Sequence, residues 1–206
     1  MAHDILIYGD IGPSYSWWDD EETGITGEWM AQQLADVPVG ESEVNIRVNS
    51  PGGICSEGLT IRNQLRVYAS RKKLSNPNFK LNGIVDGYAY SAGGVVLLGC
   101  DKIIMMSGSL FMVHNCSGMV WGNAQDLLAG AAYYQKVDGE LANILALKTG
   151  KKEADMKALL DAETFFSPEE AKVIGLCDEI DTAIVSPENR SRYGEIFTKA
   201  SPTNYK

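Results

Sequence analysis

The sequence predicts a single α/β domain in which strands and helices alternate along the chain. Strand-like and helix-like patterns follow one another roughly every 25 to 35 residues, which is typical of strands joined by crossover connections. The chain has 206 residues, of which 45% are hydrophobic and 22% are charged. This composition is ordinary for one globular domain with a core of normal size. We expect that domain over residues 1–185 and a polar tail over 186–206.

The first quarter of the chain is expected to hold two strands and a helix. "DILIYGD" (4–10) has the pattern of a short strand, and "EVNIRVN" (43–49) alternates apolar and polar residues as a strand does. Between them, "IGPSYSWWDDEETG" (11–24) is rich in turn-forming and acidic residues and is predicted to be a loop. Thr26 is placed to cap the helix that follows.

The middle of the chain is predicted to contain two successive strand–turn–helix units. "SPGG" (50–53) is the first turn, and apolar residues recur at helical spacing from Ser56 onward. "KLNGIVDG" (80–87) is a predicted strand that leads into the glycine-rich stretch "GYAYSAGG" (87–94). The apolar run "AGGVVLLGC" (92–100) is predicted to be a short buried helix.

The last part of the chain is expected to contribute three strands and three helices. The predicted strands are "KIIMM" (102–106), "SLFMVH" (109–114) and "LCDEI" (176–180). The longest helical pattern spans 123–150 and is ended by Gly150, and a further helix spans 151–161. "SPEE" (167–170) is a capping box that begins a helix ending at Gly175.

Charge and cysteine usage exclude several classes of function. The formal net charge is -9 and no basic stripe is present, so nucleic acid is not the expected partner. The four cysteines form no CxxC pair and only two histidines are present, so we expect no metal and no cofactor. The N-terminus lacks a signal-peptide pattern, and no apolar run is long enough to span a bilayer. We therefore expect a cytoplasmic protein without a membrane segment.

Ser91 is the strongest candidate for a reactive residue. It lies among three glycines and two alanines in "GYAYSAGG", where small neighbours would let another backbone approach its hydroxyl. The alternative is a tight turn built for helix packing. A serine nucleophile needs a base, and the only histidines are His3, at the terminus, and His114, at the end of a predicted strand. Because reactive groups of α/β sheets collect at strand ends, we pair Ser91 with His114.

Acyl transfer by such a pair also needs hydrogen-bond donors for the developing oxyanion. Backbone N–H groups are available at Gly52 and Gly53 in "NSPGG", and at Ala92 beside the candidate nucleophile. The GK[ST] ending of a phosphate-binding loop is absent. A glycine-rich edge could also bind an extended peptide by strand addition.

Four motifs in this order, "NSPGG", "GYAYSAGG", "MVHN" and "FFSPEEAKVIGLCDEI", resemble the proteolytic subunit of Clp protease. The resemblance covers about residues 4 to 181 and is strongest to shorter Clp-like proteases of phages and prophages, which are implicated in capsid (head) maturation. It implies the ClpP/crotonase-like fold, built from repeated ββα units with a protruding helical handle. It also implies a serine peptidase that acts on peptide or protein substrates, such as a phage capsid protein.

The resemblance assigns roles to individual residues. It implies that Ser91 is the nucleophile, that His114 is the base, and that Gly53 and Ala92 form the oxyanion hole. The third triad member is expected to be Asp161. Counting back from the "FFSPEEA" segment without a gap reaches Leu159 instead, so Asp161 fits only with a shorter loop, and Glu163 is the other candidate.

The resemblance further implies a ring-type homo-oligomer, with the helix 123–148 as part of the handle between rings. Clp subunits carry a segment before the first strand that meets the ATPase. This chain begins almost at the strand, which argues against docking to a Clp ATPase.

Three other functions remain open on the sequence alone. A crotonase-type enzyme would use glycine-rich amides to polarise an acyl-CoA thioester and carboxylates for acid–base work. A non-catalytic assembly protein could have kept the fold. A Ser–Lys peptidase could use Lys148, Lys151 or Lys152 as the base.

Overall fold

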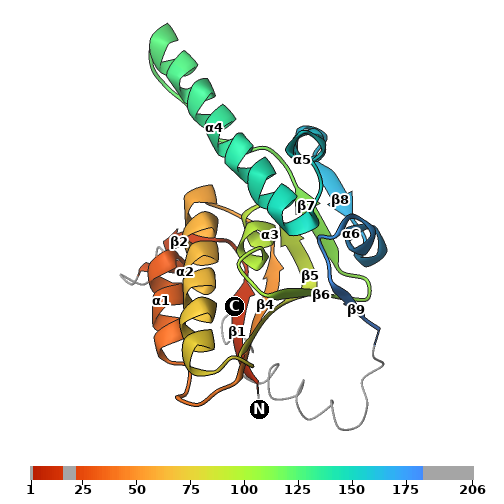
Figure 1. Cartoon of the computed structure of the whole chain (residues 1–206). Coiled ribbons are helices and arrows are strands. Elements are labelled where there is room, and N and C mark those ends of the chain that lie inside the picture. The colour runs from red at the N-terminus through yellow and green to blue at the C-terminus, as the bar shows by residue number, and fades with distance from the viewer. Residues whose placement is uncertain (1, 16–21, 183–206) are drawn as a thin grey trace, which may run out of the picture.

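A computed structural model describes residues 2–15 and 22–182, which form a seven-stranded sheet with helices packed around it (Figure 1). Five strands lie parallel in the order β1-β4-β5-β6-β9. Their bounds are His3–Tyr8 (β1), Glu43–Ser50 (β4), Lys80–Tyr90 (β5), Lys102–Met106 (β6) and Glu179–Asp181 (β9). The predicted α/β class is confirmed. The proposed tail, 186–206, lies outside the described residues.

The long strand β5 has a different neighbour along each half of its length. Its first half pairs with β6, and its last residues pair in parallel with β7 (Leu110–Val113). The short strand β8 (Thr164–Phe166) then adds antiparallel to β7. No pattern in the sequence predicts β8, because three residues are too few to show alternation. The pairing of β8 with β7 is important for the site. The chain after Asp161 is thereby brought next to the strand that precedes His114.

The prediction that residues 11–24 form a loop is wrong in part, because this segment contains two short strands. Gly12–Tyr15 (β2) and Glu22–Ile25 (β3) form an antiparallel pair. Glycine and proline within such short strands hid the pattern. Gly24 is needed there because a Cβ atom at this position would lie 2.2 Å from the carbonyl oxygen of Gly12 on the opposite strand.

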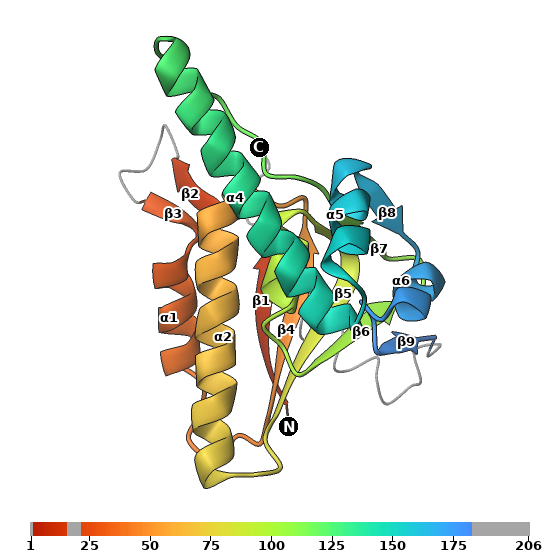
Figure 2. The same ribbon diagram turned by 45° about the horizontal axis from the view of Figure 1, so that its top comes forward.

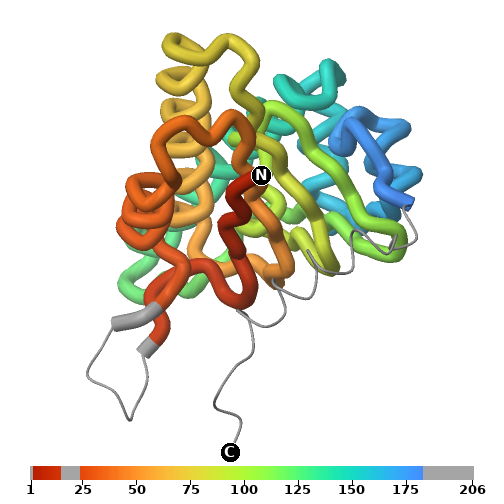
Figure 3. The backbone as a smooth tube through the Cα atoms, turned by 90° about the horizontal axis from the view of Figure 1, so that it is seen from below, coloured from red at the N-terminus to blue at the C-terminus, as the bar shows by residue number. Residues whose placement is uncertain are grey.

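Six helices are present in the described part of the chain. They are Gly27–Ala35 (α1), Cys55–Ser75 (α2), Ala92–Leu97 (α3), Ala124–Thr149 (α4), Glu153–Asp161 (α5) and Pro168–Ile174 (α6). The helices α1 and α2 lie together at one side of the molecule, and α5 and α6 lie at the other (Figures 2 and 3). The short helix α3 packs against α2, β4 and β5 and is almost entirely buried.

The predicted helix ends are confirmed. The Thr26 hydroxyl accepts a hydrogen bond from the backbone N–H of Trp29. Ser167 and Glu170 form the reciprocal capping box, and Gly150 ends α4 in the left-handed conformation with φ 68°. At 1.5 Å per residue, α4 is about 39 Å long, and its first half projects beyond the rest of the domain as a handle (Figure 1).

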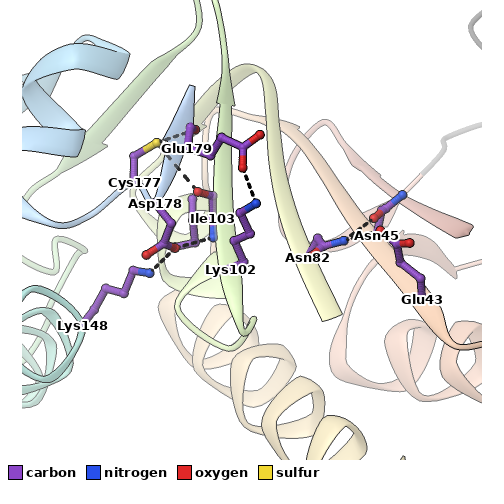
Figure 4. Close-up of polar contacts among 9 residues, drawn as sticks. All are labelled: Glu43, Asn45, Asn82, Lys102, Ile103, Lys148, Cys177, Asp178 and Glu179. Atoms are coloured by element: carbon purple, nitrogen blue, oxygen red, sulfur yellow. Dashed lines mark hydrogen bonds and ion pairs between the residues drawn. The ribbon is translucent and has the colours of Figure 1, made fainter. Parts of the chain in front are cut away.

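The two faces of the sheet differ in chemistry because side chains alternate along each strand. The helix-covered face is apolar, and its fully buried residues include Ile5, Ile7, Ile46, Val48, Leu81, Val85, Ile103 and Met105. The opposite face, called the polar face below, carries the polar residues of these strands, among them Asn45, Arg47 and Asn82. Asn82 there donates to Asn45 over 3.0 Å and to Glu43 over 2.8 Å, linking β5 to β4 (Figure 4).

A second set of polar contacts fastens the far end of the sheet to α4 (Figure 4). The Asp178 carboxylate accepts hydrogen bonds from the backbone N–H of Ile103 over 2.6 Å and from Lys148 Nζ over 2.5 Å. Lys102 pairs with Glu179 on the neighbouring strand. The C-terminal end of α4 is therefore held against the sheet while its N-terminal half projects.

Candidate active site

Ser91 occupies the sharp turn between β5 and α3. Its φ of 52° lies in the left-handed region, which a residue with a side chain rarely adopts. Hydrogen bonds on both sides hold this conformation, because Ser91 N–H donates to the Met112 carbonyl over 3.0 Å and the Ser91 carbonyl accepts from Val95. Such strain costs on the order of 1–3 kcal/mol and is typical of functional sites.

His114 reaches Ser91 because of the pairing between β5 and β7. Tyr90 is opposite Met112 in the parallel ladder, so Ser91 and His114 leave neighbouring strand ends. The imidazole Nε2 lies 2.7 Å from Ser91 Oγ. This is the distance at which a histidine with an unprotonated Nε2 accepts a serine proton. No hydrogen bond to the other imidazole nitrogen is formed within the described residues.

Two backbone N–H groups are positioned beside this pair. Gly53 and Ala92 line the same cavity as Ser91, and within the described residues neither donates a hydrogen bond. Only glycine fits the adjoining turn. A Cβ atom on Gly53 (φ 143°) would lie 2.1 Å from the Ile11 carbonyl oxygen, and one on Gly52 (φ 104°) 2.8 Å from Ser91 Cβ. The turn therefore brings free amides close to the hydroxyl.

The cavity at this site has a volume of about 550 Å³. Its apolar lining includes Ile54, Val95, Leu98, Leu141, Leu145 and Leu160. None of its described lining residues is Asp, Glu, Lys or Arg. An apolar side chain of a substrate would therefore fit, and the acid–base chemistry in the cavity rests on His114.

Two cysteines, Cys55 and Cys116, also line this cavity. Their raised pKa values make them poorer candidate nucleophiles than Ser91. Burial raises the pKa of Cys55 to about 12, and the neighbouring Cys116 adds to the shift. Burial also raises the pKa of Cys116. Because the thiolate is the reactive form, these raised pKa values favour the less reactive thiol form of both cysteines. Among these three candidate nucleophiles, Ser91 is the one whose oxygen lies at hydrogen-bond distance from an imidazole nitrogen.

Asp161 does not bind the His114 imidazole in this structure, which differs from the expected triad geometry. Its carboxylate accepts a hydrogen bond from Asn115 Nδ2 over 2.8 Å and pairs with Lys157, one helical turn earlier on α5. These two donors hold the pKa of Asp161 below its ordinary value, Asn115 contributing most. The carboxylate therefore holds the loop that carries His114 by way of the next residue, Asn115.

The other candidates for the base and for the third triad member lie outside the cavity that contains Ser91. Glu163 has a positive φ of 47° at the turn into β8, and neither it nor Leu159 lines the cavity. Lys148 binds Asp178, and Lys151 and Lys152 are exposed. The sequence did not single out Asn115, and its position directly after the histidine was the only available signal.

Residues 2–15 and 22–182 offer neither a metal-binding cluster nor a membrane-spanning helix. No group of three or more His, Cys, Asp or Glu residues there could hold a metal ion. No described helix has the length and apolar character required to cross a membrane.

Comparison with known proteins places this chain in a family. The family model for Clp protease matches residues 21–183, a range that includes Ser91 and His114. The chain belongs to the Clp protease family. Among solved structures, a mutant of ClpP1 from Listeria monocytogenes is similar with a TM-score of 0.67 and 20% sequence identity, over 88% of this chain and 92% of that one. This likeness confirms the ClpP-like fold.

Proposed function

We propose that the protein is a serine endopeptidase. Ser91 Oγ attacks the carbonyl carbon of a peptide bond, and His114 Nε2 takes its proton. The amides of Gly53 and Ala92 donate to the resulting oxyanion. His114 then passes the proton to the leaving amine, and water releases the acyl group from Ser91 by the same steps.

The observation that carries this proposal is the 2.7 Å contact between Ser91 Oγ and His114 Nε2. The contact is supported by the two free amides beside it and by membership of the Clp protease family. A protein that had kept only the fold as a scaffold would have no need to hold its serine in a strained conformation within reach of a histidine.

Two further features of the cavity favour a peptidase over the other enzymes on this fold. A crotonase-type enzyme would need carboxylates for its acid–base steps, and the described residues of the cavity lining include none. A Ser–Lys peptidase would need a lysine there, and none of the three candidate lysines lines the cavity.

We further propose that the enzyme is of the phage or prophage type, works in a ring of identical subunits, and cleaves a capsid protein. The resemblance of the four motifs supports this narrower assignment. The projecting handle α4 supports the ring.

Reaction with a serine-directed fluorophosphonate probe tests the proposal. The wild-type protein should be labelled at Ser91, and it should cleave members of a fluorogenic peptide library. Ser91→Ala and His114→Ala should each lower kcat by roughly 10⁴-fold, and the double variant should be little worse, because the two residues act as one unit.

Cys55→Ala is the matched control, since it removes a different nucleophile from the same cavity. It should still be labelled at Ser91. Labelling that persists in Ser91→Ala, or full activity in His114→Ala, would overturn the assignment.

A further inference from the structure

A buried carboxylate on α4, Asp138, holds the loop that carries His114. Only 7% of Asp138 is exposed. Its Oδ1 accepts a hydrogen bond from the backbone N–H of Cys116 over 2.7 Å. Cys116 is two residues past His114, in a segment without regular structure.

Asp138 lies on a face of α4 whose neighbouring residues are apolar. Residues three, four and seven positions later, Leu141, Ala142 and Leu145, are all buried. These spacings place all four side chains on one helical face, which turns toward the core. A carboxylate on such a face is costly to bury unless it forms hydrogen bonds. Its retention there needs a function other than packing.

The segment after β7 needs such an anchor because its strand pairing stops at Val113. From His114 onward the backbone has no ladder to fix it. Two side chains from outside the segment form hydrogen bonds with it instead. Asp161 binds Asn115 from the exposed side, and Asp138 binds the backbone of Cys116 from the buried side. Of the two, water competes less for the buried contact.

We propose that Asp138 is a positioning residue for His114, acting through the backbone of Cys116. It touches neither the reacting atoms nor the cavity. It keeps Nε2 within reach of Ser91 Oγ by fixing the path of the chain two residues later. This inference rests on the proposed peptidase function.

The test compares two replacements of nearly the same size. Asp138→Leu removes the acceptor, so the Cys116 N–H is left buried and unpaired, and the loop shifts to expose it to water. A displacement of about 1 Å at a catalytic group can cost 10²-fold, so we expect kcat to fall by about 10- to 100-fold. KM should change less. The rate of fluorophosphonate labelling at Ser91 should fall in parallel.

Asp138→Asn keeps an oxygen acceptor and should be about tenfold or more faster than Asp138→Leu. Glu140→Leu makes a similar change on the exposed face of the same helix and should leave the labelling rate unchanged. If Asp138→Leu does not fold, as judged by circular dichroism, Asp138→Ala serves for the same comparison.

The outcomes separate this inference from the proposed function. If the wild type is not labelled at Ser91, the peptidase proposal fails and this inference fails with it. If the wild type is labelled and the folded Asp138→Leu protein reacts equally fast, only the inference is overturned. Equal losses in Asp138→Leu and Asp138→Asn would also overturn it, since the acceptor oxygen would then not matter.

Discussion

At the scale of single residues, the site depends on backbone conformation as much as on side-chain identity. Ser91 is held at a positive φ, and the turn opposite it accepts only glycine at positions 52 and 53. With these choices, Gly53, Ala92 and Ser91 line the same cavity. The glycines around Ser91 lie against different neighbours: a Cβ atom on Gly93 would meet Ser50 of β4, one on Gly94 the Phe111 ring, and one on Gly87 the Asn49 side chain.

The role of Asp161 gives a prediction at this scale. Since its carboxylate binds Asn115 and Lys157, Asp161→Asn should lower kcat by about tenfold or less, well below the loss of a triad aspartate. Lys157→Met is the matched variant, because it removes the other partner and leaves the carboxylate in place. Steady-state kinetics on one fluorogenic peptide measures both.

A loss of roughly 10³-fold or more in Asp161→Asn alone would contradict this expectation. It would mean that Asp161 leaves Asn115 and binds the imidazole during catalysis. If Glu163→Gln caused the larger loss, the role would move to Glu163.

At the scale of elements, three strands are joined across the polar face by one carboxylate. Asp86 on β5 accepts a hydrogen bond from the Tyr8 hydroxyl on β1 over 2.7 Å and from Arg47 Nε on β4 over 3.0 Å. Burial, followed by the hydrogen bond to Asp86, raises the pKa of Tyr8 to about 12. The contact ties together β1, β4 and β5, and the C-terminal end of β5 leads directly to Ser91.

This contact predicts a pH-dependent contribution to stability. The folded state holds the Tyr8 proton more tightly than the unfolded state, so the contribution is complete below about pH 10 and is lost as the pH rises toward 12. At pH 8, Tyr8→Phe should lower the free energy of unfolding by about 1 kcal/mol, the typical value of one hydrogen bond.

Urea unfolding at pH 8 and pH 11 measures the difference between wild type and variant, which should shrink at the higher pH. Tyr88→Phe is the control, because Tyr88 is 50% exposed on the same strand as Asp86. A difference that stays constant with pH would show that the Tyr8 hydroxyl does not contribute in this way.

At the scale of the whole molecule, the projecting handle carries apolar side chains into solvent. Leu128 on α4 is 72% exposed, and Met119 and Trp121, in the segment leading into α4, are 78% and 80% exposed. Large apolar side chains exposed together on one part of a molecule are typical of an interaction surface. Together with the family resemblance, they favour association of identical subunits.

We predict a closed assembly of about six subunits or more. Leu128→Glu should shift it toward smaller species, because a charge would be buried without a partner on association. Light scattering behind a sizing column measures the mass. Val39→Glu is the control, since Val39 is fully exposed away from the handle. A wild-type monomer at all micromolar concentrations would contradict the prediction.

The sequence by itself determined the α/β class, nearly all of the helices and long strands, the capping residues, and the pairing of Ser91 with His114. Each of these depends on local periodicity, on turn chemistry, or on the small number of histidines. The sequence did not predict the strands β2, β3 and β8, because short strands form only when a partner completes their hydrogen bonds.

Only the tertiary structure decided which carboxylates bind the segment that follows His114. The family resemblance, with a shorter loop, led us to expect Asp161 as the partner of the imidazole, and the fold instead pairs it with Asn115 and Lys157. Asp138 lies 24 positions after His114, yet the packing of α4 brings its oxygen to the Cys116 backbone. Hydrogen bonds between distant segments depend on how helices dock on the sheet, and no local pattern encodes that.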